Sequence, residues 1–450
     1  MKPKRLMCVV TLTLFAIAIP LGLAAQDIQD HHHKQVRYSV KILGTLGGTI
    51  NDVVGINNRG EAAGSSTLPG DQVRHAALWW NGAIIDLGTL GGPDSVAPEA
   101  SPQPNDRGEI AGASYTSAPD PNAAQFCSLF MFVSDPYTCR PFVWRRGVMV
   151  ELPTLDNNNA IAWQVNNRGQ VPGISQITTP DPTCSIPELE GKPVIWERGK
   201  IQQLPTISGD LDGLAGAIND RGQAVGSTGN CVLDIPLTSL HAVLWQRAGH
   251  RWTATDLGNL GGTEWNLAFG VNKLGQVVGQ SGLPGNMAFH AFLWSEGVMT
   301  DLGTLPGDFV SWAETINDSA QAVGASFDAS GNARAVVWEN GAITDLNMLI
   351  PPGSPWLLWE ALGNNDRGQI VGPAFNTMTG EFQSYLLTPC DEKHPNIEGC
   401  DYSMVDASAA ASVPTASVQS ARREASPRVS PTVLRRRNYR FRFPAFDPQN

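Results

Sequence analysis

Three tryptophans in the second half of the chain each lie within two residues of a glutamate: Glu264 and Trp265, Trp312 and Glu314, and Trp359 and Glu360. Two carboxylates close together can serve as the acid and the nucleophile or base of a glycosidase. The same residue types can instead bind a sugar without reaction, because an indole ring covers an apolar sugar face and a carboxylate accepts hydroxyl hydrogen bonds. Packing inside the fold is the simplest interpretation of any one tryptophan.

A second set of residues pairs a histidine or arginine with an acid 11 or 15 positions later: His75 and Asp86, Arg140 and Glu151, His241 and Asp256, His290 and Asp301, and Arg334 and Asp345. A histidine–aspartate proton shuttle would need a nucleophile and would not tolerate arginine in place of histidine. Diagonal neighbours on one face of a hairpin lie within side-chain reach. We therefore interpret the pairs as structural clasps that join two strands by hydrogen bonds.

These pairs recur because the sequence itself repeats. Residues 290–307 read HAFLWSEGVMTDLGTLPG, and residues 75–92 read HAALWWNGAIIDLGTLGG. A second element, Asn-x-x-Gly followed by small residues, occurs in seven copies whose first asparagines are Asn57, Asn105, Asn166, Asn219, Asn272, Asn317 and Asn365. Repetition at a regular interval indicates a repeated unit of structure rather than a catalytic motif.

Each unit predicts four short strands. The Asn-x-x-Gly element suits a tight turn between the first two strands, and the HAFLW-like segment forms the third. A hairpin turn follows, for which Asn81-Gly82 is a clear signal, and the fourth strand runs into DLGTLGG. Four antiparallel strands in about 50 residues are typical of a propeller blade. The sequence therefore predicts an all-β, seven-bladed β-propeller.

The repeats resemble the HAF-repeat family of extracellular proteins, named for the tripeptide seen here as His290-Ala291-Phe292. The resemblance covers residues 43 to 388 and recurs in order seven times. It implies secretion and a β-propeller fold. It carries no catalytic residue and no ligand.

The units are offset around the ring. The seventh lacks a fourth strand, whereas residues 37–48 supply an extra segment that ends in Leu-Gly-Thr-Leu-Gly-Gly. We expect residues 38–46 to pair beside residues 383–388, which closes the ring and covers an open sheet edge. The loss of charge at both Gln383 and Ile42, the clasp positions of that blade, supports this pairing. The propeller would span residues 38–388.

Residues 1–25 have the pattern of a secretory signal, with Lys2, Lys4 and Arg5 before an apolar stretch. Residues 26–37 would be a linker, residues 389–402 a cysteine-containing loop, and residues 403–450 a disordered tail rich in Ala, Ser and Pro and then in Arg. We expect a secreted or extracellular protein, periplasmic in a bacterium, and membrane attachment only if the signal is retained.

Six cysteines follow the signal, an even number that favours disulfides in an oxidising compartment. Their order and loop positions favour the pairs Cys127–Cys139, Cys184–Cys231 and Cys390–Cys400, one set among 15 possible pairings. None has the spacing of a zinc site. We expect no metal and no cofactor.

The formal net charge of −11 makes nucleic acid an unlikely ligand of the propeller. No phosphate-binding loop, nucleophile elbow or dinucleotide fingerprint occurs in the sequence. We expect a monomeric, non-enzymatic propeller that binds a glycan or a protein on the face of its variable loops. The alternatives are a carbohydrate-active enzyme using the Glu and Trp residues, and a structural cell-surface repeat protein.

Overall fold

The computed structural model describes residues 36–98, 104–121, 126–131, 135–184, 188–231 and 240–400. The expected signal segment, almost all of the expected linker and the expected tail lie outside the described residues.

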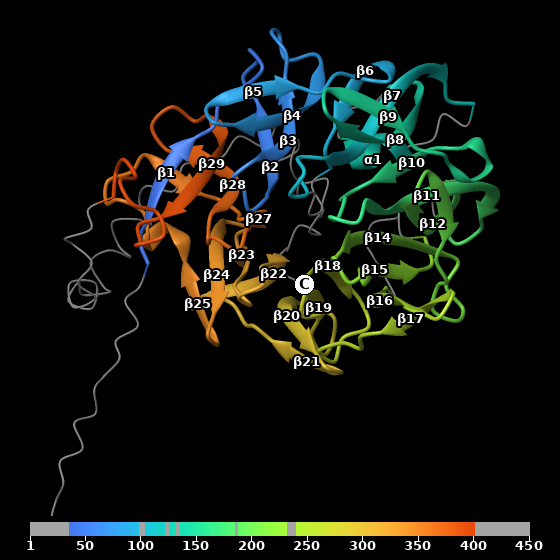
Figure 1. The fold of residues 1–450 in the computed structure, drawn as a ribbon. Coiled ribbons are helices and arrows are strands. Elements are labelled where there is room, and N and C mark those ends of the chain that lie inside the picture. The colour runs from blue at the N-terminus through green and yellow to red at the C-terminus, as the bar shows by residue number, and fades with distance from the viewer. Residues whose placement is uncertain are drawn as a thin grey trace, which may run out of the picture. The chain divides into compact units, whose positions relative to one another are not determined.

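Seven antiparallel sheets form a ring around a central axis, each with its first strand innermost (Figure 1). Blade 1 contains β2 (Asn51–Ile56), β3 (Ala62–Thr67), β4 (Arg74–Trp80) and β5 (Ala83–Asp86). Blade 2 contains β6 (Gly91–Val96), β7 (Ile110–Pro119), β8 (Tyr137–Arg145) and β9 (Val148–Glu151). Blade 3 contains β10 (Ala160–Ala162), β11 (Gln170–Asp181), β12 (Glu188–Glu197) and β13 (Lys200–Gln203).

The next three blades repeat the same order. Blade 4 contains β14 (Asp212–Ile218), β15 (Ala224–Gly229), β16 (His241–Ala248) and β17 (Arg251–Asp256). Blade 5 contains β18 (Leu267–Val271), β19 (Val277–Gly282), β20 (Phe289–Ser295) and β21 (Val298–Asp301). Blade 6 contains β22 (Asp308–Ile316), β23 (Ala322–Asp328), β24 (Ala333–Glu339) and β25 (Ala342–Asp345).

Blade 7 combines segments from both ends of the described chain. Its inner strands are β26 (Trp356–Leu358) and β27 (Gly363–Asn364), followed by β28 (Ile370–Asn376), β29 (Phe382–Pro389) and, outermost, β1 (Tyr38–Ile42). Strand β1 runs antiparallel to β29, from Tyr38 opposite Pro389 to Ile42 opposite Tyr385. The seven-bladed fold and its closure by the N-terminal strand are therefore confirmed.

The first asparagine of each turn links its blade to the next. The Asn219 side-chain oxygen accepts hydrogen bonds from the N–H groups of Arg221 and Gln223, both at 3.0 Å. Its Nδ2 donates to Gln223 Oε1 at 2.9 Å and to the backbone oxygen of Asn272, in the next blade, at 2.8 Å. The amide group is thus fully hydrogen-bonded although it is buried.

The same blade-to-blade bond occurs at every boundary, from Asn57 to Asn105 and onward, and Asn365 closes the circle by donating to the oxygen of Asn57 at 2.8 Å. We call this circle of seven side-chain-to-backbone bonds the asparagine ring. It explains why a Gln or Glu stands four residues after each asparagine, since that side chain accepts the second Nδ2 hydrogen.

Two kinds of glycine are required around this ring. The turn glycines, such as Gly222, have a positive φ, and Ala320 takes the same left-handed conformation in the sixth copy at φ 61°. The glycine of each second strand lies very close to the backbone of the first strand or of the segment next to it. A Cβ on Gly226 would come within 2.1 Å of the Leu214 oxygen, and six other blades show the same crowding. The small residues of the motif therefore reflect close approach of two backbones.

The opposite end of the blades is joined by the DLGTLGG segments. The leucine N–H of each segment donates to a side-chain hydroxyl on the second strand of the following blade, as from Leu90 to Ser114 at 2.8 Å and from Leu260 to Ser281 at 2.9 Å. Third-strand tryptophans donate to the same connections, as from Trp245 to the Pro205 oxygen at 2.7 Å. Both ends of each blade are thereby tied to a neighbour.

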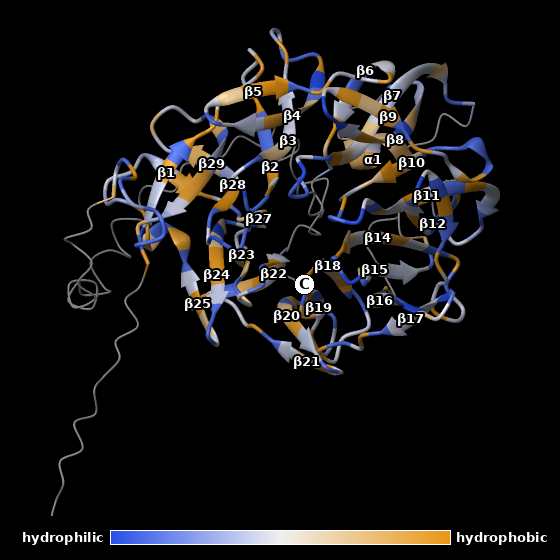
Figure 2. Cartoon of the chain, viewed as in Figure 1, coloured by the Kyte–Doolittle hydropathy of each residue, from blue (hydrophilic) through white to orange (hydrophobic). Residues whose placement is uncertain are grey.

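Apolar side chains fill the spaces between blades, and Figure 2 shows them concentrated on the strands. A short helix, α1 (Phe126–Met131), brings Phe126 and Met131 into a cluster with Trp163 of blade 3 and Leu267 of blade 5. Two 3-10 turns, η1 (Leu155–Asn157) and η2 (Leu346–Met348), occur in the connections after β9 and β25. Within the described residues, no helix is long and apolar enough to cross a membrane.

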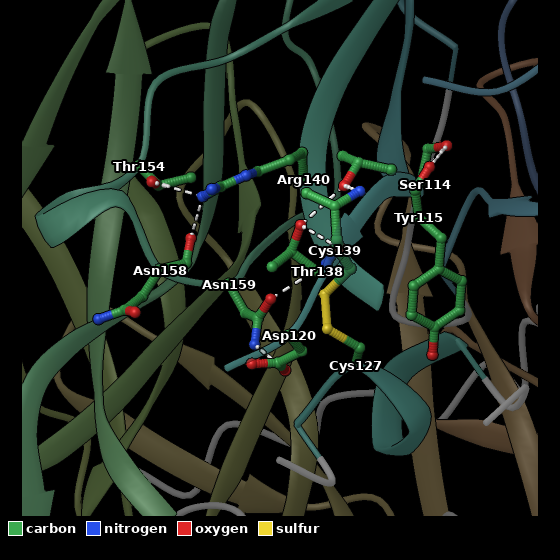
Figure 3. The surroundings of a disulfide bond; sticks show 12 residues. Ser114, Tyr115, Asp120, Cys127, Thr138, Cys139, Arg140, Thr154, Asn158 and Asn159 are labelled. Carbon is green, nitrogen blue, oxygen red and sulfur yellow. Dashed lines mark hydrogen bonds between the residues drawn. A yellow bond between two sulfur atoms is a disulfide. The ribbon is translucent and has the colours of Figure 1, made fainter. Parts of the chain in front are cut away.

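All three predicted disulfides are present. Cys127–Cys139 joins α1 to β8, and nearby Asn159 accepts from the Cys139 N–H and donates to Asp120 (Figure 3). Cys184–Cys231 joins blades 3 and 4, and Cys390–Cys400 closes the loop after β29. The disulfides therefore hold segments that the regular strand ladder does not hold.

We predict that Asn219→Asp lowers the free energy of unfolding by about 2 kcal/mol, because the new carboxylate oxygen faces the Asn272 carbonyl where a donor stood. The carboxylate still accepts the two turn N–H groups, so the turn itself is retained. Chemical denaturation measures the change. The control is Asn81→Asp in an exposed hairpin turn, and equal losses in the two variants would contradict a special role of the ring.

Candidate functional site

The alternation of strands separates two ends of the propeller. The Asn-x-x-Gly turns and the turns between third and fourth strands lie at one end, which we call the turn end. The connections between blades and the loops between second and third strands lie at the other, which we call the loop end. The three tryptophans singled out in the sequence belong to segments at or leading from the loop end of blades 5 to 7.

The structure brings these tryptophans into one aromatic cluster. The Trp265 ring lies 5.7 Å from Phe289, whose ring lies 6.2 Å from Trp312. Trp312 is 4.3 Å from Phe327, and Trp359, 5.7 Å from Phe382, packs against the same group. The three tryptophans, 47 positions apart in the sequence, thus pack in one largely buried aromatic cluster that spans three blades.

The members of the cluster differ in exposure. Trp312 on β22 is 3% exposed and belongs to the core. Trp265 and Trp359 are only half-buried. Trp265 also has a left-handed backbone conformation, with φ 64°, which is rare for a bulky residue. Such strain is often retained where a side chain must be presented in one orientation.

The three glutamates are likewise not equivalent. Glu314 on β22 is 2% exposed, so the structure places it in the interior. Glu264 and Glu360 are half-buried beside Trp265 and Trp359 in the sequence. The backbone oxygen of Glu360 accepts the Tyr385 hydroxyl at 2.7 Å, which anchors this segment. Two carboxylates therefore accompany the two accessible indoles.

The clasps also bring histidine and carboxylate together, a combination that can exchange protons. His75 Nδ1 lies 2.8 Å from Asp86, and His290 Nδ1 lies 2.9 Å from Asp301. Burial would raise the pKa of Asp301, but hydrogen bonds from His290 and from the Gly303 N–H outweigh it and lower that pKa. These contacts join third and fourth strands of one blade.

The arginine pairs are looser than expected. Arg140 lies 3.8 Å from Glu151, while its guanidinium makes shorter bonds to Thr154 and Asn158 in the next connection (Figure 3). Arg334 lies 3.9 Å from Asp345 and forms a closer ion pair with Asp308. The nearer oxygens come from the connection after β9 for Arg140, and from the first residue of β22, in the same blade, for Arg334.

The pairing predicted for His241 is wrong. Its Nδ1 bonds to Asp210, at 2.9 Å, and not to Asp256. Asp210 precedes β14 in the connection from blade 3 and also accepts the Thr228 hydroxyl. The Asp256 carboxylate accepts the Gly258 N–H instead, at 2.8 Å. Strand register alone could not predict a carboxylate supplied by a connection between blades.

We predict that Asp210→Asn lowers the free energy of unfolding by about 1 kcal/mol, because it weakens a partly buried hydrogen bond to His241. The matched control is Asp256→Asn, which keeps an oxygen for the Gly258 N–H and should leave stability nearly unchanged. Thermal and urea unfolding of both variants measure the difference. A larger loss in Asp256→Asn would restore the original pairing.

A buried pair of acids lies beside Cys184–Cys231. Asp212 is fully buried, and its Oδ1 accepts the Gly191 N–H at 2.8 Å. The pKa of Asp212 is raised to about 8. Burial is the largest cause, and the hydrogen bond to Asp181 and the negative charge of Asp181 follow. Burial would also raise the pKa of Asp181, but hydrogen bonds from Thr183 and Asp212 lower it. Of the two acids, Asp212 is therefore the one whose protonated form is favoured.

Asp181 also lies close to both sulfurs of this bridge, a grouping that resembles a set of metal ligands. The two sulfurs are joined to each other, so they cannot act as thiolate ligands. The grouping is accounted for by the disulfide and the acid pair.

We predict that the wild-type protein loses stability relative to Asp212→Asn as the pH rises from about 4 to about 8. The folded-state pKa of Asp212 lies above its ordinary value of 3.8, so protonation of this group favours the fold. That contribution is complete below the ordinary pKa and disappears as the pH passes about 8. Unfolding curves across this pH range test the sign, with Asp256→Asn as control. If the stability of wild type and of Asp212→Asn changed in parallel with pH, the raised pKa of Asp212 would be contradicted.

A polar cavity of about 330 Å³ lies on the axis at the turn end, inside the asparagine ring. The second residue of each turn faces it and is bonded to its neighbours: Asn167 donates to both Asp106 and Asp220, and Lys273 forms an ion pair with Asp318 at 2.7 Å. The sequence alone did not predict these bonds between neighbouring turns. The Asp or Asn at the second position of six of the seven turns was the signal that could have indicated them.

No family model matches the chain, and no curated protein matches it, so the resemblance to HAF-repeat proteins stays a prediction from the repeats. Solved structures give fold-level likenesses. The β-propeller domain of the Trilobed protease from Pyrococcus furiosus, described as having an open velcro topology, is 9% identical, with a TM-score of 0.41, over 75% of this chain and 97% of that one.

Two other solved structures are also similar in part. A Mycobacterium tuberculosis puromycin-hydrolyzing peptidase is 11% identical with a TM-score of 0.44, over 78% of this chain and 56% of that one. Trypanosoma rangeli sialidase in complex with sialic acid is 8% identical with a TM-score of 0.33, over 79% of this chain and 54% of that one. This chain thus spans little more than half of either protein. Such distant similarity transfers no function.

Proposed function

We propose that the protein is a secreted, non-enzymatic binding propeller whose ligand is a neutral glycan held at the loop end of blades 5 to 7. The observation that carries the proposal is the pair of partly buried tryptophans, Trp265 and Trp359, packed against one aromatic cluster. Trp312 is buried in the cluster against which both side chains pack.

The chemistry of this surface suits a sugar without net charge. An indole face packs on the C–H face of a pyranose, and the partly exposed Glu264 and Glu360 can accept hydroxyl hydrogen bonds. The chain carries a formal net charge of −11, which disfavours anionic polymers at this surface. The backing by Phe289 and Trp312 holds Trp265 in place, so little freedom is lost on binding.

Secretion is supported by the bonded cysteines. Three disulfides in one chain are typical of proteins from an oxidising compartment. Two of them hold loop-end segments, namely α1 and the loops joined by Cys184–Cys231, which is the end that we assign to the ligand. Extracellular glycans would be accessible to such a protein.

We predict that Trp265→Ala and Trp359→Ala each weaken glycan binding by about tenfold or more, since stacking on one ring contributes roughly 1 to 3 kcal/mol. An array of neutral oligosaccharides identifies the probe, and calorimetry with that probe measures the affinity. The melting temperature should change little because both side chains are half-exposed. Trp312→Ala is unsuitable as a probe because removal of this core side chain would itself destabilise the fold.

The control is Trp80→Ala. Trp80 is 40% exposed and precedes the hairpin turn of blade 1 at the turn end, so its loss should not affect the glycan. Equal weakening by Trp80→Ala, or undiminished binding in both loop-end variants, would overturn the proposal. So would an array on which no neutral glycan binds.

A further inference from the structure

A second feature lies at the turn end, in the groove between blades 3 and 4. A cavity of about 470 Å³ is lined by Arg168 and Arg221 from two successive Asn-x-x-Gly turns, by Arg198 from the hairpin turn of blade 3 and by Arg247 near the end of β16 in blade 4. The one acid among its described lining residues is Glu197. This concentration of arginine is unusual in a chain with a net charge of −11.

The turn arginines of blades 1 and 2 each form an ion pair with a nearby glutamate, whereas those of blades 3 and 4 have no such glutamate. In blades 1 and 2, the turn arginine is followed two residues later by glutamate, and Arg59 and Glu61 form an ion pair at 3.0 Å while Arg107 and Glu109 form one at 2.6 Å. In blades 3 and 4 the equivalent residues are Gln170 and Gln223. The acid that balances the turn arginine is thus replaced by a neutral amide on both sides of one groove.

The nearby acids are engaged elsewhere. Glu197 accepts from Arg247 at 2.7 Å and from Gln170 at 3.1 Å, so its charge serves Arg247. The Asp220 carboxylate accepts hydrogen bonds from the backbone N–H and the side chain of Asn167 beside the axial cavity. Arg247 also stacks on Trp252, 4.9 Å from the ring centroid, which fixes its orientation. Arg168, Arg198 and Arg221 are exposed and remain without an acid of their own in the described lining of the cavity.

We propose that this groove is an anion site for a small ligand that carries a phosphate or sulfate monoester. Guanidinium groups bind tetrahedral oxyanions through paired N–H donors, and four arginines from two blades line this cavity. Arg168 and Arg221 each also donate to a backbone oxygen, of Arg221 and Leu274 respectively, which leaves their other N–H groups for a ligand. The cavity has the size of a site for a single sugar-sized molecule rather than a polymer. Gln223 and Gln246 lie in the same lining and offer further donors to hydroxyl groups.

The site is independent of the glycan surface, because it lies at the opposite end of the propeller and in other blades. Failure of one proposal therefore leaves the other unaffected. The hairpin turns offer a matched control, since Arg146 in blade 2 occupies the same turn position as Arg198, with φ 51° and 53° respectively. Both side chains are exposed, so loss of either should not affect the fold.

The test is calorimetric titration of the full chain with inorganic phosphate and inorganic sulfate, then with glucose 6-phosphate and glucose 6-sulfate, at constant ionic strength set by chloride. We expect at least one oxyanion to bind with a dissociation constant below about 1 mM. Arg198→Gln and the double variant Arg168→Gln/Arg221→Gln should each weaken it by about tenfold or more, whereas Arg146→Gln should bind as wild type. The two esters distinguish phosphate from sulfate as the preferred group.

Three outcomes would overturn the assignment: no saturable binding of any of the four anions, equal weakening by Arg146→Gln, or binding that persists in both groove variants. Binding restricted to a polymeric anion would also overturn it, because the cavity would then be part of a diffuse charged surface. Melting curves for each variant confirm that lost binding is not lost folding.

Discussion

The structure depends on one hydrogen bond repeated at every blade boundary, from an asparagine side chain to the backbone oxygen of the corresponding asparagine in the next blade. A single four-stranded blade cannot bury both of its faces, so blades are stable only side by side. The asparagine sets their spacing at the axis, because the same amide also holds its own turn through two N–H groups. A shift of one blade would break bonds in two turns at once.

The two ends of the propeller consequently have different freedom to vary. At the turn end, the side chains that form the ring cannot change without leaving buried polar groups unpaired. The other turn positions can change, and the replacement of Glu by Gln in blades 3 and 4 converts a neutralised arginine pair into a basic groove. At the loop end, connections bind through backbone N–H groups to hydroxyls, which leaves the outer side chains of the loops open to substitution.

The clasps show how the same position adapts to its surroundings. His75 and His290 bond to the acid on the neighbouring strand. His241 bonds instead to Asp210 from a connection between blades, and Arg334 to Asp308 at the start of β22. What the repeat preserves is a basic or imidazole group near a carboxylate, and the local chain path decides which carboxylate. In the buried pair Asp181 and Asp212, burial and the charge of Asp181 favour the protonated form of Asp212.

The sequence by itself determined the number of blades, the strand order and the closure by the N-terminal segment, because each follows from a repeated motif or from its absence in one unit. The three disulfides were predicted from cysteine order and loop position, as one set among 15 possible pairings. It also identified Trp265, Trp312 and Trp359 before their contact was known. Only the tertiary structure decided that Trp312 is core while Trp265 and Trp359 are accessible, since all three stand in similar sequence surroundings. The partner of His241, the asparagine ring and the arginine groove likewise required the fold, because each joins residues from different blades. Spacing along the chain predicts contacts within a repeat, whereas contacts between repeats depend on how the blades are rotated against one another.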